Sequence, residues 1–168
     1  MSRRFIPEPP IFTFRVRLPG YRDEDGTKVE DVWRAIEIAA NQTLEELGEL
    51  IPLAFDFDDP HMWSFFLSGK AWDQTTEYAL SSEPGIFDDA EPRAAGDILI
   101  RDVPLPGTSG KKEFLFLFDY GDEWHFRVKF MGRSDTVEPG AAYPRVVAQQ
   151  GEAPPQYEGL DEEDGEGE

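Results

Sequence analysis

The chain has 168 residues, of which 39% are hydrophobic and 13% aromatic, and its formal net charge is −19. This length and composition suit one globular domain with its own core, and the absence of cysteine excludes disulfides, thiolate zinc sites and a cysteine nucleophile. The acidic balance disfavours direct binding to nucleic acid, which depends on neutralising phosphates, and no run of residues approaches the roughly 20 apolar ones that would cross a membrane.

The first predicted elements are an N-terminal arm and a pair of strands. Residues 1–10 hold no readable signal peptide, so we interpret them as the arm of a cytoplasmic protein. Residues 11–18 alternate between apolar and polar side chains, which predicts a half-buried strand. Residues 32–38 predict a second strand, antiparallel to the first, and the connection between the two contains the tight-turn pair Asp25-Gly26.

One amphipathic helix is predicted after these strands, over residues 44–55. Thr43 and Glu46 have the spacing of a capping box, in which each residue bonds to a backbone amide of the other. Pro52 lacks a backbone donor and crowds the carbonyl of Gly48, so we expect the helix to kink near Pro52 or to end just before it.

The middle of the chain predicts three further strands around an irregular excursion. Residues 62–67 form the first of these strands, residues 70–97 are irregular, and residues 98–103 suit a helical turn or a strand fragment. Residues 114–118 are apolar on both faces, which predicts a central strand covered on both sides. Residues 124–130 alternate and complete a hairpin with that strand.

The end of the chain is predicted to be an edge segment followed by an acidic tail. Residues 143–148 suit an edge strand or a segment along the surface. Residues 151–168 hold eight acidic residues and no basic one, which predicts a largely disordered tail. Its Pro154, Pro155 and Tyr157 are the residues we expect to dock on the body.

The fold class that follows is a single α+β domain over residues 11–150. We expect a mostly antiparallel, twisted sheet of about five strands, with one main helix packed on one face.

Five short motifs follow one another in a characteristic order. They are Trp33-Arg34, residues 43–47, Asp58 to His61, Asp119 to Trp124, and the segment from Pro144 to the pair Pro154-Pro155. Together they resemble the plasmid pRiA4b Orf-three-like family over roughly residues 12–157. The resemblance implies a compact α+β domain found in bacteria, archaea and their plasmids, associated with mobile elements and without an established activity.

The chain departs from this family pattern at four positions. Many members have Trp, His and two Cys where this chain has Phe57, Phe126, Ala153 and Tyr157. The missing His and Cys make a family-wide metal site harder to carry over to this chain.

Two acidic turns are the sharpest candidates for chemistry. They comprise Asp58, Asp59 and His61 after the helix, and Asp119, Asp122, Glu123 and Trp124 at the hairpin tip. If both turns lie at the same end of the sheet, several carboxylates and one imidazole converge, and such ligands suit Mg²⁺ or Mn²⁺. The ion could then activate water for the hydrolysis of a phosphoester or an amide.

The alternative interpretation of these turns is structural, because Asp and Gly are ordinary turn residues. In this interpretation Asp119 holds the hairpin tip and Asp122 caps the backbone amides after Gly121. His61 then bonds to a backbone group at the start of a strand, and His125 points to solvent.

Basic side chains on adjoining strands form another candidate surface. They are Arg15, Arg17, Arg34, Arg127 and Lys129. A basic strip on an acidic protein would dock an acidic peptide or a nucleic acid, and the alternative is a solvated face.

From these patterns we predict a non-catalytic binding or adaptor domain with a protein partner, rather than an enzyme. One alternative is a divalent-metal-dependent hydrolase that uses the two acidic turns. The other is an acidic regulator that binds a basic protein, which depends on the net charge of −19.

Overall fold

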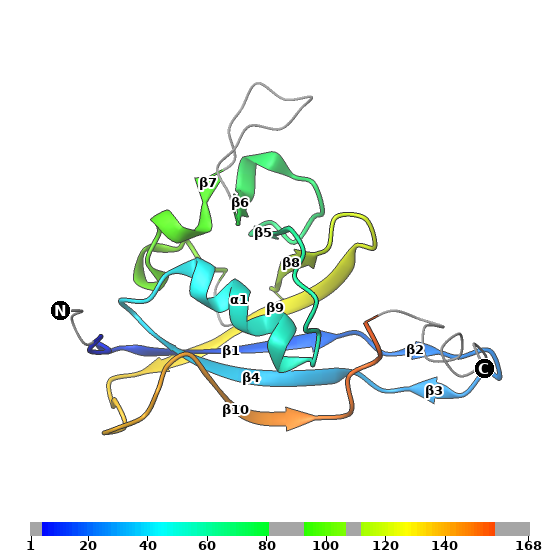
Figure 1. Cartoon of the computed structure of the whole chain (residues 1–168), viewed down its shortest axis with the longest axis horizontal. Coiled ribbons are helices and arrows are strands. Elements are labelled where there is room, and N and C mark those ends of the chain that lie inside the picture. Colours follow the sequence, from blue (N-terminus) through cyan, green and yellow to red (C-terminus); the bar gives the residue numbers. More distant parts are fainter. Residues whose placement is uncertain (1–4, 81–92, 107–111, 157–168) are drawn as a thin grey trace.

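The computed structural model describes residues 5–80, 93–106 and 112–156. Within these residues eight strands form one sheet around which the whole molecule is built (Figure 1). In spatial order they are β10 (Arg145–Gln150), β4 (Val32–Ala39), β1 (Ile11–Leu18), β9 (Trp124–Ser134), β8 (Phe114–Phe118), β5 (Trp63–Phe66), β6 (Glu77–Ala79) and β7 (Arg93–Ala94). Helix α1 (Leu44–Ala54) packs on one face of this sheet, so the predicted α+β class is confirmed.

The sheet is larger than the predicted sheet of about five strands. All neighbouring pairs are antiparallel except β6 and β7, which pair in parallel. Strands β6 and β7 have three and two residues, so they are too short to show the alternation from which strands are predicted. Strand β10 is the edge strand that was one of two alternatives for residues 143–148.

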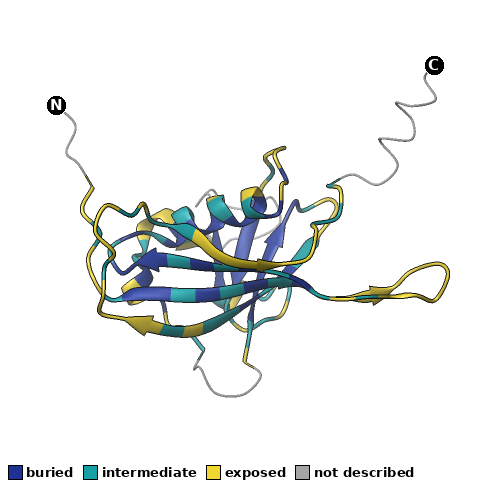
Figure 2. Ribbon diagram, turned by 90° about the horizontal axis from the view of Figure 1, so that it is seen from below, coloured by how far each residue is buried: buried dark blue, intermediate teal, exposed yellow. Residues whose placement is uncertain are grey.

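A separate two-stranded hairpin extends from the end of the sheet. Strand β2 (Tyr21–Arg22) pairs with β3 (Lys28–Val29) around the predicted Asp25-Gly26 turn. Figure 2 shows this hairpin as an exposed arm, whereas the strands behind it are mostly buried or intermediate.

Strand β8, the first arm of the β8–β9 hairpin, lies in the interior, as predicted. All five residues of β8 are buried, and the strand pairs with β9 on one side and with β5 on the other. Phe116 lies opposite Phe126 in β9 and Phe65 in β5, and the ring centroids are 5.8 Å and 4.8 Å away. The main core therefore forms between this aromatic layer and α1.

Helix α1 begins at the predicted capping box. The Thr43 hydroxyl accepts a hydrogen bond from the Glu46 amide at 3.2 Å, and the Glu46 carboxylate accepts one from the Thr43 amide at 2.8 Å. The helix continues through Pro52 to Ala54, so the expectation that it ends just before Pro52 is wrong. Pro52 costs the helix the one hydrogen bond to the carbonyl of Gly48, and the helix ends two residues later.

The irregular middle of the chain contains three short 3-10 helices in the described residues. They are η1 (Gln74–Thr76), η2 (Ala95–Asp97) and η3 (Ile100–Asp102). The helical-turn alternative for residues 98–103 is therefore correct, while residues 81–92 of the predicted excursion lie outside the described residues. In the described part of the chain, helices are too short and too polar for a membrane span.

Candidate functional site

Asp119 holds the tip of the β8–β9 hairpin. It has a positive φ of 68°, and its amide donates to the carbonyl of Met62 at 2.8 Å. Its Oδ1 accepts hydrogen bonds from the amides of Gly121 at 3.1 Å and Asp122 at 3.3 Å. The carboxylate that caps these amides is that of Asp119, where we expected that of Asp122. The buried Asp119 thus has a structural role that the turn itself requires.

The two acidic turns meet at His61. Its Nε2 lies 3.5 Å from Oδ2 of Asp119 and 3.8 Å from Oδ2 of Asp59. Strand register explains the meeting, because Trp63 of β5 lies directly opposite Phe118 of β8. His61 lies two residues before Trp63, and Asp119 lies one residue after Phe118. The two side chains must therefore adjoin.

The hairpin residues beyond Asp119 belong to a different part of the surface. Asp122, Glu123 and Trp124 line a cavity of about 720 Å³ that also contacts Pro154 and Pro155. This places the two prolines beside the body, while Tyr157 lies outside the described residues. The predicted site residues therefore divide into two groups.

Trp124 and His125 have neighbours of their own in that second group. The Trp124 ring packs edge-on against Phe57, with the ring centroids 4.7 Å apart. Glu123 Oε1 lies 3.3 Å from Nε2 of His125, a half-exposed pair at the surface. Trp124 and His125 line a different cavity from His61, so the two histidines do not share a site.

The converging residues do not have the arrangement of a metal centre. Across residues 5–80, 93–106 and 112–156, no group of three or more His, Asp or Glu side chains is placed to hold a metal ion. One oxygen of Asp119 is already bonded to two turn amides. The His61 ring also packs edge-on against Phe118, which fixes it between the carboxylates. This arrangement places one imidazole between two carboxylates, and it does not present an open set of ligands.

A cavity of about 260 Å³ lies beside these residues, between the end of α1 and the turn that follows. We call it the α1 cavity, and it is lined by Glu49, Pro52, Leu53, Phe57, Asp58, Asp59, Pro60, His61, Trp63, Leu80 and Phe118. Its charged edge consists of the carboxylates of Glu49, Asp58 and Asp59, which are exposed. Its interior is apolar and aromatic, and Leu53 is 60% exposed at its opening. A cavity of this kind suits a cation carried on an apolar stem.

The α1 cavity includes residues that the sequence analysis did not select. Glu49 and Leu53 lie four residues apart on the outer side of α1 and reach its edge together. A signal was present, because Leu53 is an apolar residue that lies off the buried stripe of the helix.

The predicted basic strip is smaller than expected. Arg34 lies on the core face of β4 with 4% of its surface exposed, so it is not part of the strip. Arg17 is bonded by two hydrogen bonds of 2.8 Å to Glu113 and lies 3.2 Å from Asp31. The hydrogen bond from Arg17 holds the pKa of Glu113 below its usual value. Arg15 and Lys129 lie opposite each other on the outer face.

Comparison with known proteins confirms the resemblance seen in the motifs. The family model described as plasmid pRiA4b ORF-3-like protein matches residues 12–161. Among solved structures, a protein of unknown function, MM3350 from Methanosarcina mazei Go1, superposes with a TM-score of 0.63 at 18% sequence identity. The match covers 88% of this chain and 73% of that one, and at this identity it shows the fold alone. No curated protein gives a significant match.

Proposed function

The chain belongs to the plasmid pRiA4b ORF-3-like protein family, and we propose that it is a non-catalytic binding module that captures a positively charged segment of a partner protein. The observation that supports this proposal is the α1 cavity, in which three exposed carboxylates surround an aromatic interior. A lysine or arginine side chain combines a positive charge, which matches the carboxylates, with an apolar stem, which matches the aromatic interior.

The physical match involves both ends of such a side chain. Its methylene stem would lie against Leu53 and Phe57, since long cationic side chains bury their stems on apolar surface. Its charged head would remain at the edge, close to the carboxylates of Glu49 and Asp58. The net charge of −19 adds a long-range attraction that speeds the encounter with a cationic partner.

Binding of a basic peptide to paired charge variants tests this proposal. The probe is a fluorescein-labelled peptide of alternating lysine and leucine, and fluorescence anisotropy reports its binding. We expect the variant Glu49→Gln/Asp58→Asn to bind roughly fivefold more weakly, because each edge carboxylate contributes a partly exposed charge pair.

The matched control is Glu24→Gln/Asp135→Asn, which removes the same net charge at exposed positions away from the cavity. We expect this control to bind within about twofold of the unmodified protein, since distant surface charges act only through the screened field. Leu53→Ser should also weaken binding, because it removes the apolar contact at the opening. If the two charge variants lose equal affinity, only the overall charge attracts the peptide and the proposal is wrong.

The hydrolase alternative is tested by thermal unfolding in MnCl₂. An ion that binds only the folded protein raises Tm in proportion to the logarithm of its concentration. A rise that disappears in His61→Ala would favour a metal site at the two acidic turns over the binding module.

A further inference from the structure

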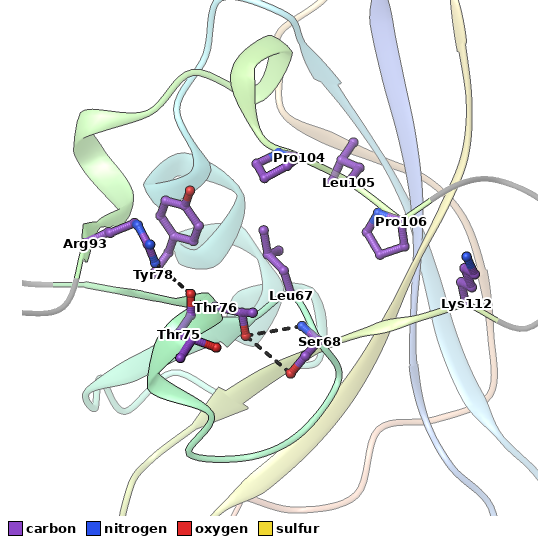
Figure 3. A pocket seen from close by; sticks show the side chains of 10 residues that line it. All are labelled: Leu67, Ser68, Thr75, Thr76, Tyr78, Arg93, Pro104, Leu105, Pro106 and Lys112. Atoms are coloured by element: carbon purple, nitrogen blue, oxygen red, sulfur yellow. Dashed lines mark hydrogen bonds between the residues drawn. The ribbon is translucent and has the colours of Figure 1, made fainter.

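Another cavity lies at the β6–β7 end of the sheet and has a different chemical character (Figure 3). Its volume is about 410 Å³, within the usual range of small-molecule sites. We call it the β6–β7 cavity, and it is lined by Leu67, Ser68, Thr75, Thr76, Tyr78, Arg93, Pro104, Leu105, Pro106 and Lys112.

The charges around the β6–β7 cavity oppose those of the whole protein. Both charged side chains that line it, Arg93 and Lys112, are cationic, and no carboxylate of the described residues lines it. The chain as a whole has 35 acidic and 16 basic residues. Two cations without a carboxylate among the described lining residues create a local attraction for an anion.

Arg93 is held in place at this cavity. Its guanidinium donates one hydrogen bond to the carbonyl of Thr75 at 3.1 Å and lies over the Tyr78 ring at 5.5 Å (Figure 3). Among the described residues this hydrogen bond uses one of the five N–H donors of the group, which leaves donors for an anion. Arg93 is therefore positioned by two contacts and still able to bind a carboxylate.

The remaining lining residues divide into a polar and an apolar part. The hydroxyls of Ser68 and Thr76 are bonded to each other at 3.3 Å, and they lie on the same loop as Thr75. Leu67, Leu105 and two prolines supply apolar surface opposite them. An apolar cavity with a few convergent polar groups is typical of a site for a small molecule.

We propose that the β6–β7 cavity binds a small carboxylate with an apolar body, such as a medium-chain alkyl carboxylate. The carboxylate binds the guanidinium of Arg93, and the apolar body lies against Leu67 and Leu105. Lys112 lies at the other end of the cavity, where its charge adds to the attraction for an anion (Figure 3). A monoanion suits this cavity better than a polyphosphate, because two cations cannot offset several negative charges on a protein of net charge −19.

Calorimetric titration with octanoate tests the proposal. We expect octanoate to bind, octylammonium not to displace it, and butanoate to bind more weakly than octanoate because it covers less of the apolar surface. The variant Arg93→Gln should weaken octanoate binding about tenfold, as expected for the loss of a charge-assisted contact to a carboxylate.

The matched control is Arg22→Gln. Arg22 is an exposed arginine that also donates one hydrogen bond to a carbonyl, that of Gly26, but it lies on the β2–β3 hairpin away from the cavity. We expect Arg22→Gln to bind octanoate within about twofold of the unmodified protein, because distant exposed charges are screened. Thermal unfolding of each variant shows that the exposed substitutions leave the fold intact.

Four outcomes would overturn the proposal. Three of them are no binding of octanoate at millimolar concentration, equal binding of octan-1-ol, and equal losses of octanoate affinity in Arg93→Gln and in Arg22→Gln. A peptide ending in leucine that binds more tightly than octanoate would assign the cavity to protein C-termini and would also overturn it. The basic peptide used for the α1 cavity should not displace octanoate, so this inference and the proposed function can fail separately.

Discussion

At the scale of single residues, Arg34 is the side chain whose surroundings are most unusual. It is buried on the core face of β4 and donates hydrogen bonds to the carbonyls of Trp33, Ala54, Gln150 and Gly151. The guanidinium also lies over the Phe55 ring at 4.9 Å. Burial lowers the pKa of Arg34, yet an arginine stays protonated at neutral pH. One cation therefore connects β4, the end of α1 and the segment that follows β10.

Replacing Arg34 should destabilise the fold more than its position on a strand suggests. We expect Arg34→Gln to lower the free energy of unfolding by about 2–4 kcal/mol, because several carbonyls lose their donors in a buried place. Arg34→Lys should recover only part of this loss, since an ammonium cannot reproduce the planar fork. Urea unfolding measures both values.

Arg15→Gln is the matched control for Arg34, because Arg15 also lies over an aromatic ring, that of Trp33 at 5.5 Å, but on the outer face. The free energy of unfolding of Arg15→Gln should fall by only about 0.5–1 kcal/mol, the value of an exposed cation–π contact. Equal losses at the two arginines would contradict the anchoring role of Arg34.

The direction of the Arg34 side chain could be predicted from the sequence, and its hydrogen-bond acceptors could not. Strand alternation places it on the same face as Val32 and Ile36, which are core residues, so its inward direction could be predicted. Its acceptors could not, because the carbonyls of Gln150 and Gly151 are more than 100 positions away in the chain and reach Arg34 only after β10 has paired with β4.

At the scale of elements, the contact between α1 and β5 depends on one glycine. A Cβ atom on Gly48 would lie 2.4 Å from the Cη2 atom of the Trp63 ring, which is closer than two carbons can approach. Trp63 is itself 3% exposed and packed against Phe65 and Phe116, so the ring has no space to withdraw. The missing side chain of Gly48 thus sets how closely the helix lies on the sheet.

The variant Gly48→Ala separates packing from helix propensity, because the two predict opposite signs. In a free helix, alanine is more stable than glycine by roughly 1 kcal/mol. Here we expect a loss of about 1–3 kcal/mol, as is usual when a side chain is forced into a filled core. Thermal or urea unfolding gives the sign directly.

A double-mutant cycle with Trp63→Leu tests the cause of that loss. In the Trp63→Leu protein the side chain at position 63 is smaller, so Gly48→Ala should lower the free energy of unfolding by less. The difference gives a coupling energy of about 1 kcal/mol or more between positions 48 and 63. A Gly48→Ala protein that is more stable than the unmodified one would show that the helix can shift away from Trp63.

Elements with a local pattern could be predicted, and elements formed by pairing could not. The capping box of α1 and the apolar run of β8 both carry their own signal. Strand β6 forms on the edge of β5, and β7 forms on the edge of β6, so their two or three residues were insufficient for a prediction. The meeting of His61 and Asp119 likewise follows from the pairing of β5 with β8, two segments separated by about fifty residues.

At the scale of the whole molecule, the dominant feature is the uneven distribution of a charge of −19. The α1 cavity is bordered by carboxylates, whereas the β6–β7 cavity is lined by two cations. Our two proposals therefore assign ligands of opposite charge to the two cavities. The same excess charge should also limit the stability of the folded chain, since like charges repel more strongly in the compact state.

Salt should therefore stabilise this protein. Sodium chloride shortens the screening length from about 30 Å at 0.01 M to about 8 Å at 0.15 M, which weakens repulsion across the surface. It also weakens ion pairs such as Arg17–Glu113, but such partly exposed pairs are worth about 0–1 kcal/mol each, so the relief of repulsion should prevail. We expect Tm, measured by calorimetry, to rise by roughly 2–5 °C over this range.

A variant with Glu24, Asp25, Asp135 and Glu152 changed to their amides should show a smaller rise of Tm with salt, because fewer charges repel. If Tm instead falls with salt, the surviving ion pairs hold the fold more strongly than the excess charge opposes it.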